Sequence, residues 1–107
     1  MASGLSDLGR FAEPALLILV SLAEGPKHGY AIMTDVEAVT GSPLGPGTLY
    51  AALGRLERRG LIQPLPAEDR RRPYRLTGLG ETTLEEQLRE LERFARAGLT
   101  RLASSRP

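Results

Sequence analysis

The sequence predicts a mainly α-helical fold with one small β-hairpin: a winged helix-turn-helix followed by a long C-terminal dimerisation helix. Apolar residues recur at helical spacing in four segments. Two short strand-like runs flank an arginine-rich turn, and a leucine stripe follows Thr77. The predicted order is therefore helix, helix, helix, strand, strand and long helix. We divide the chain into an N-terminal arm (1–12), the winged helix-turn-helix (13–77) and the dimerisation helix (78–107).

The composition limits the classes of function. A chain of 107 residues predicts one domain with a small core. It contains no cysteine, which excludes disulfides and thiolate metal sites and fits a reducing cytoplasm. The longest apolar run, Pro14 to Ala23, is too short to span a bilayer, so we expect no membrane partner.

The first three helices are bounded by residues that start or stop helices. The first begins near Glu13, with Pro14 in its first turn, and stops at Gly25-Pro26. It is apolar on nearly all sides and should be buried. The second begins near His28 and ends at Gly41, a residue suited to a left-handed C-terminal cap. The third is predicted over 46–60.

The hairpin is expected over 61–76. A short strand covers 61–65, where Pro64 favours an edge position because it donates no ladder hydrogen bond. The tip covers 66–73, and 74–76 returns as the second strand. Thr77 is a candidate N-cap for the last helix, although Gly78 and Gly80 weaken its first turn.

Positive charge is concentrated in one part of the chain. The formal net charge is only +1, but residues 55–75 hold seven arginines and three acidic residues. Residues 1–54 instead have an acidic excess. A local cluster of arginine in the third helix and hairpin indicates an anionic partner for that segment.

The third helix has the pattern of a DNA-reading helix. Its anchors to the core are Leu49, Leu53 and Leu56, and the outward face carries small residues and arginine. Small side chains allow close approach to a base edge, and hydroxyl or guanidinium groups bond bases and phosphates. The alternative is an ordinary surface helix with solvated arginines. The outward residues are Thr48, Ala51, Ala52, Arg55, Arg58 and Arg59, with Tyr50 at the border.

The hairpin tip carries Arg70, Arg71 and Arg72 in succession. Three adjacent like charges repel each other, and a polyanion relieves that repulsion through phosphate contact or minor-groove insertion. The alternative is a solvated loop that Glu68 and Asp69 partly neutralise.

No residue set predicts catalysis, a metal or a cofactor. His28 is the single histidine, and no cysteine or second histidine is present to complete a metal site. No acid, base and nucleophile assemble, so we expect no enzyme. We interpret His28 as a cap or packing group, and we expect Tyr30 to pack against the core with its hydroxyl outward, within reach of a phosphate.

The last helix carries a stripe that predicts dimerisation. A helix of about 25 residues extends ~37 Å, too far for the domain beneath to cover its whole stripe. The steps of four, three, four and seven residues approximate a heptad seam with a gap at Gly98. The stripe residues are Leu84, Leu88, Leu91, Ala95 and Leu102.

Taken together, these segments resemble the PadR family of transcriptional regulators. The resemblance rests on ALLILVSLAEGPKHGYAI (15–32), GPGTLYAALGRLERRGLI (45–62) and RPYRLTGLG (72–80), in order and without a large gap. It implies a homodimeric winged-helix repressor on a palindromic operator, with Tyr30, Thr48, Tyr50 and the wing arginines near double-stranded DNA. Gly45 departs from the serine that the family often has there.

Two matters stay open at this point. The resemblance allows an unidentified small-molecule effector, although the absence of tryptophan argues against a flat aromatic ligand between stacked indoles. The alternative function is a winged-helix adaptor that binds an acidic protein and does not bind DNA specifically.

Overall fold

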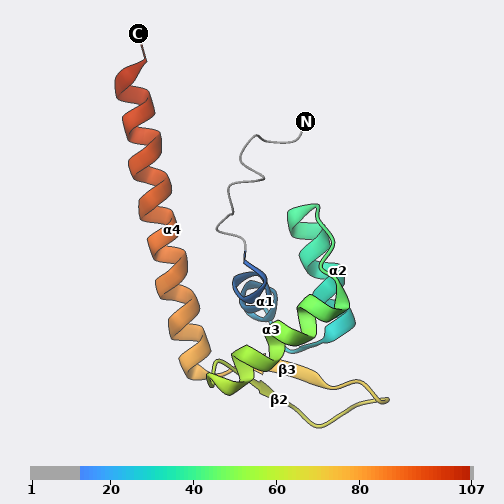
Figure 1. Cartoon of the computed structure of the whole chain (residues 1–107). Helices are drawn as coiled ribbons and strands as arrows, with labels where there is room; N and C mark the ends of the chain where they lie inside the picture. The colour runs from blue at the N-terminus through green and yellow to red at the C-terminus, as the bar shows by residue number, and fades with distance from the viewer. Residues whose placement is uncertain (1–12, 107) are drawn as a thin grey trace.

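The computed structural model describes residues 13–106, so the predicted arm (1–12) lies outside the described residues. The structure is mainly helical, with a small antiparallel sheet and a long last helix (Figure 1). This confirms the predicted fold class. In chain order the elements are α1 (Pro14–Leu22), β1 (Lys27–His28), α2 (Gly29–Thr40), α3 (Pro46–Arg58), β2 (Ile62–Pro64), β3 (Pro73–Leu76) and α4 (Gly78–Ser105).

The sheet has three strands where the sequence predicted a two-stranded hairpin. Its order is β1-β3-β2, and β1 pairs with β3 through Lys27 opposite Tyr74. A two-residue strand is too short to show alternation in the sequence, so only the tertiary pairing reveals it. Pro64 lies on an edge strand, as predicted, since β3 occupies the centre.

The core is aliphatic and lies between the first three helices and the sheet. Ile18, Ile32 and Leu49 are fully buried, one from each of the helices α1, α2 and α3. The predicted anchors Leu53 and Leu56 are buried beside them. Burying an aliphatic side chain stabilises the fold by roughly 1.5–3 kcal/mol, so this cluster holds α3 in place.

The helix ends follow the predicted signals closely. Gly41 caps α2 in the left-handed conformation, with φ of 76°. The helix α3 ends at Arg58, two residues before the predicted Gly60, because the chain turns through Gly60 with φ of 75°. The Thr77 hydroxyl accepts from the Gly80 N–H at 3.0 Å and so caps α4 as expected.

Gly80 has a packing role that the sequence did not indicate. A Cβ on Gly80 would lie 2.0 Å from the carbonyl oxygen of Leu61. The helix α4 therefore begins against the backbone that leads into β2, and only glycine permits that approach. The Thr77 N–H also donates to the same Leu61 carbonyl.

Lys27 joins α1, β1 and α2. Its ammonium donates to Asp35 at 3.1 Å, and it also contacts Glu24 and the Ser21 hydroxyl. Burial alone would lower the pKa of Lys27, but the hydrogen bonds to Glu24 and Asp35 raise it above its usual value. The Ser21 hydroxyl and then Lys27 lower the pKa of Asp35.

The helix α4 extends well beyond the body of the molecule (Figure 1). The molecule measures 59 × 31 × 20 Å along its principal axes. Among residues 13–106, α4 is buried against the domain near its start, and Leu84 is its last buried apolar residue. Within residues 13–106, no helix combines the length and the apolar character needed to cross a membrane.

Candidate nucleic-acid interface

The helix α3 separates its side chains into a buried and an exposed face. Leu49, Leu53 and Leu56 point into the core, as predicted. Thr48, Ala51 and Arg55 are exposed and recur at steps of three and four residues, so they share one face. The sequence placed Ala52 on the outward face, which is wrong: Ala52 is fully buried because it lies three residues from Leu49 and four from Leu56.

Arg58 extends the exposed face of α3. It is exposed and follows Arg55 by three residues, so it lies one turn further along the same face. The sequence predicted Arg58 on the outward face, and its exposure confirms this. The helix thus presents one hydroxyl, one methyl and two guanidinium groups in sequence.

The two tyrosines at the α2–α3 junction are exposed. Tyr30 is 67% exposed, so the expectation that it packs against the core is wrong. The buried face of α2 runs through Gly29, Ile32 and Val36, and Tyr30 falls outside that face. Tyr50 is 54% exposed and its ring lies over Gly29, where a Cβ would be 2.5 Å from the phenol oxygen. Gly29 therefore lets the Tyr50 ring rest on the start of α2.

The wing, residues 65–73, ends in a tight two-residue turn. The backbones of Glu68 and Arg71 exchange two hydrogen bonds, of 2.7 and 2.8 Å. Asp69 and Arg70 between them both have positive φ, of 48° and 66°. Two successive residues with positive φ are typical of a type I′ hairpin turn, where asparagine and glycine are preferred. Arg70 is therefore held in a conformation that costs a non-glycine residue free energy.

The three wing arginines lie in three different environments. All are exposed. Arg72 donates to the Leu65 carbonyl at 3.0 Å and so stabilises the base of the wing. Arg71 approaches the His28 ring. Among residues 13–106, Arg70 makes no hydrogen bond or ion pair, which leaves its guanidinium free at the tip.

His28 caps α2, which confirms its interpretation as a cap. Its Nδ1 accepts from the Ala31 N–H at 3.4 Å, and its Nε2 lies 3.4 Å from Nη1 of Arg71. The contact with Arg71 joins residues 43 positions apart and links the wing to the start of α2. No pattern in the sequence indicates such a pair.

Tyr74 fixes the wing beneath α3. Burial raises the pKa of the Tyr74 phenol, and the nearby Glu57 and Tyr50 raise it further. The phenol is therefore neutral at physiological pH. Tyr74 is also partly buried against the core cluster that holds Leu49 and Leu53 of α3, so the base of the wing packs on the same core as α3.

Comparison with known proteins decides the family. The model of the transcriptional regulator PadR-like family matches residues 18–86, more than half of the chain. The chain belongs to this family. It is a family of transcriptional regulators and not of enzymes, so membership agrees with the lack of a catalytic set and implies DNA binding.

Three known proteins are similar to this PadR-like chain over most of its length. A transcriptional regulator of Mycobacterium tuberculosis is 40% identical over 84 residues, which cover 76% of this chain and 78% of that protein. An uncharacterized 37.1 kDa protein of a Streptomyces fradiae transposon is 44% identical over 86 residues. That match covers 80% of this chain but only 25% of the transposon protein.

The third is a crystal structure of a PadR family regulator from Clostridium difficile. It superposes with a TM-score of 0.72 at 27% identity and covers 86% of this chain and 99% of that one. The likeness extends over both the winged helix-turn-helix and the long last helix. The predicted fold is therefore that of solved PadR proteins.

The stripe on α4 of this PadR-like chain is mostly uncovered. Leu84 is buried in the domain's own core and Leu91 is partly buried, whereas Leu88 and Leu102 are 42% and 52% exposed. Ala95 is exposed as well. Two further apolar residues that the predicted stripe did not include, Phe94 and Leu99, are 80% and 67% exposed.

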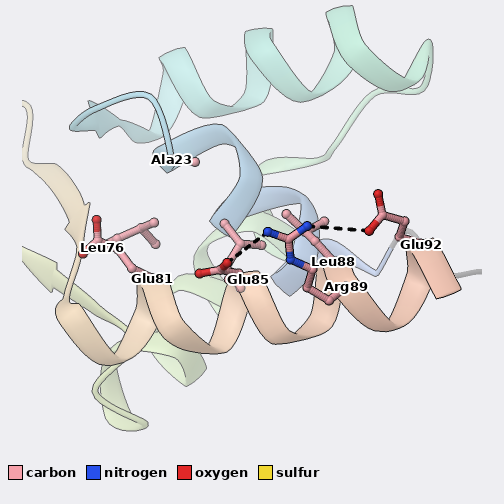
Figure 2. Close-up of a pocket in the computed structure, with 8 residues that line it drawn as sticks. Ala23, Leu76, Glu81, Glu85, Leu88, Arg89 and Glu92 are labelled. Carbon is pink, nitrogen blue, oxygen red and sulfur yellow. Dashed lines mark hydrogen bonds and ion pairs between the residues drawn. The ribbon is translucent and has the colours of Figure 1, made fainter.

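A hollow of about 380 Å³ lies where α4 leaves the domain. Figure 2 shows Leu76 and Leu88 at its wall and Arg89 between two carboxylates of the rim. Arg89 pairs with Glu85 at 3.3 Å and with Glu92 at 3.6 Å. The hollow combines apolar walls with charged groups, as ligand sites do, but a small-molecule effector stays a prediction.

The described residues hold no group of three or more metal-ligating side chains. The candidate functional site consists of the exposed polar and basic groups of α2, α3 and the wing.

Proposed function

We propose that this protein is a sequence-specific DNA-binding repressor that acts as a homodimer on a palindromic operator. The recognition helix α3 enters the major groove, and the wing contacts the backbone or the minor groove. The observation that carries the proposal is the division of α3 into an aliphatic face locked in the core and an exposed face of small, hydroxyl and guanidinium groups.

The exposed face of α3 has the chemistry of base reading. Arg55 can donate two parallel hydrogen bonds to a guanine edge, and Thr48 can bond a base or a phosphate. Ala51 between them is small enough to let the helix approach and to touch a thymine methyl. Because the core fixes α3, these groups reach the groove already oriented, which lowers the entropy lost on binding.

The wing has the chemistry of backbone binding. Arg70 is held at the tip in an unfavourable conformation although glycine would adopt it freely. A strained residue is kept where its side chain is used, and an unpaired guanidinium at a projecting tip suits a phosphate or a narrow minor groove. Figure 1 shows the wing extending on the side away from α4.

The apolar residues of α4 support a second copy as the partner. Four apolar side chains between 88 and 102 are about half or more exposed, which water disfavours. A second α4 would cover them and would give a two-fold dimer. Two α3 helices would then lie in successive major grooves, ~34 Å apart, and the bound dimer would block access to the promoter.

The test is DNA binding measured by fluorescence anisotropy on the protein's own promoter and on bulk genomic DNA. The promoter should bind at least about a thousandfold more tightly than bulk DNA, and affinity should fall steeply as salt rises. Replacing Arg70, Arg71 and Arg72 together by alanine should weaken binding about a hundredfold and flatten the salt dependence.

The matched control removes the same charge from α4 and its C-terminal cap residue. Arg93, Arg101 and Arg106 are exposed, and replacing all three by alanine should change affinity far less. Equal losses in both triple variants would indicate attraction by net charge alone. Equal affinity for promoter and bulk DNA, or capture of an acidic protein with no DNA binding, would contradict the proposal and favour the adaptor.

A further inference from the structure

The pair formed by His28 and Arg71 contains more donors than acceptors. Arginine only donates hydrogen bonds, so Nη1 of Arg71 can bond Nε2 of His28 only if that nitrogen carries a lone pair. The Ala31 N–H makes the same demand of Nδ1. A neutral imidazole has one lone pair and a protonated one has none, so the ring cannot satisfy both donors.

The surroundings do not supply the missing acceptor. Glu68 and Asp69 line the same hollow, of about 660 Å³, as His28 and Arg71. Among residues 13–106, no ion pair joins either carboxylate to Arg71. The Lys27 ammonium, on the residue before His28, is bound by Asp35 and Glu24. The other charged groups that line the hollow with His28 and Arg71 are Lys27, Glu68 and Asp69.

An anion between the ring and the guanidinium would remove the conflict. A phosphate oxygen accepts from Nε2–H of the ring and from Nη1 of Arg71 at once. The Nε2–H tautomer leaves Nδ1 free to accept from the Ala31 N–H, so the α2 cap is kept. The wing and the first turn of α2 would then bind the same phosphate.

We propose that His28 and Arg71 together hold one DNA backbone phosphate. This rests on the proposed DNA binding and adds His28 to the residues that contact DNA. The bound phosphate accepts from both side chains, so the two donors no longer compete for the lone pair of one ring.

The test measures operator affinity at one pH and one ionic strength for the full chain, for His28→Asn, for Arg71→Gln and for the double variant. Asparagine is a good N-cap, so His28→Asn keeps the α2 cap and removes the imidazole ring. Each single variant should bind the operator about tenfold more weakly than the wild-type protein, as expected of one lost charge-assisted hydrogen bond.

Because both side chains hold the same phosphate, the double variant should bind more tightly than the product of the two single losses predicts. Circular dichroism shows that each variant is folded. If His28→Asn binds like the wild-type protein, or if the two losses simply multiply, the inference is overturned while the proposed function stands. If the wild-type protein binds no specific DNA, the proposed function itself fails.

Discussion

The reading surface, which we define as the exposed face of α3 together with the wing (65–73), and the helix α4 both expose side chains, but of opposite chemical character. The α3–wing surface exposes charged and small groups over a tightly buried aliphatic face. The helix α4 exposes leucine and phenylalanine, with burial only near its start. The first surface is stable in water and ready for a polyanion, whereas the second gains stability only when an apolar partner covers it.

The two regions should therefore respond separately to mutation. Charge changes on the wing should alter DNA affinity and leave assembly unchanged. Changes on the α4 stripe should alter assembly first and DNA affinity only as a consequence. Within residues 13–106, the two regions are linked at the start of α4, where Thr77 and Gly80 contact the backbone of Leu61 and Gly60 and Leu84 enters the core.

The change with the largest expected effect disrupts the close approach of Gly80 to the Leu61 carbonyl. Gly80→Ala places a Cβ against the Leu61 carbonyl and should lower the free energy of unfolding by about 3 kcal/mol or more. Gly78→Ala is the matched control in the same first turn, where a Cβ meets nothing within 4 Å. Chemical denaturation compares the two. Equal stability of both variants would show that the close approach is unimportant.

A second prediction compares a substitution on the α4 stripe with one on the opposite face of the same helix. Leu102→Glu puts a charge on the stripe and should weaken the dimer about a hundredfold, while Thr100→Glu lies on the far side and should leave it unchanged. Analytical ultracentrifugation over a concentration series gives both dissociation constants. A Leu102→Glu protein that stays as dimeric as the wild type would exclude the stripe from the interface.

A third change should move stability and affinity in opposite directions. Arg70→Gly removes the strain of a left-handed arginine and should stabilise the fold by up to about 1 kcal/mol. It also deletes the free guanidinium at the tip, so operator affinity should fall about tenfold. Thermal unfolding and anisotropy measure the two effects, and a loss in stability would contradict the account of the turn.

The smallest expected effect concerns the carboxylate of Asp35 in α2, which accepts a hydrogen bond from Lys27 in β1. Because the folded pKa of Asp35 is lowered from 3.8, its ionised form contributes stability above about pH 4, and the contribution is lost as the pH falls through the folded value. Asp35→Asn should be about 1 kcal/mol less stable at neutral pH, and the gap should narrow below pH 4. Exposed Glu37→Gln on the same helix should show no such gap.

The sequence predicted the helices well because their signals are local. The leucines of α3 and α4 repeat over many turns, and Gly41 and Thr77 mark helix ends through their own chemistry. The strand β1 escaped prediction because two residues carry no period and their pairing is with Tyr74, far along the chain.

The candidate site was predicted less completely than the fold. Ala52 and Tyr30 lie near the border between two helix faces, where spacing alone does not decide burial. The link between His28 and Arg71 depends on the tertiary arrangement that brings the wing to α2. The exposed Phe94 was missed because it falls beside the leucine stripe and not within it.

The central claim is that two reading surfaces act together because α4 pairs them. Hydroxyl-radical footprinting on an operator selected from random DNA tests it most directly. The wild-type dimer should protect two symmetric half-sites with centres one helical turn, ~34 Å, apart, and Leu102→Glu should lose both protections together at the same protein concentration. A single protected half-site, or protection by Leu102→Glu equal to that of the wild type, would contradict the claim.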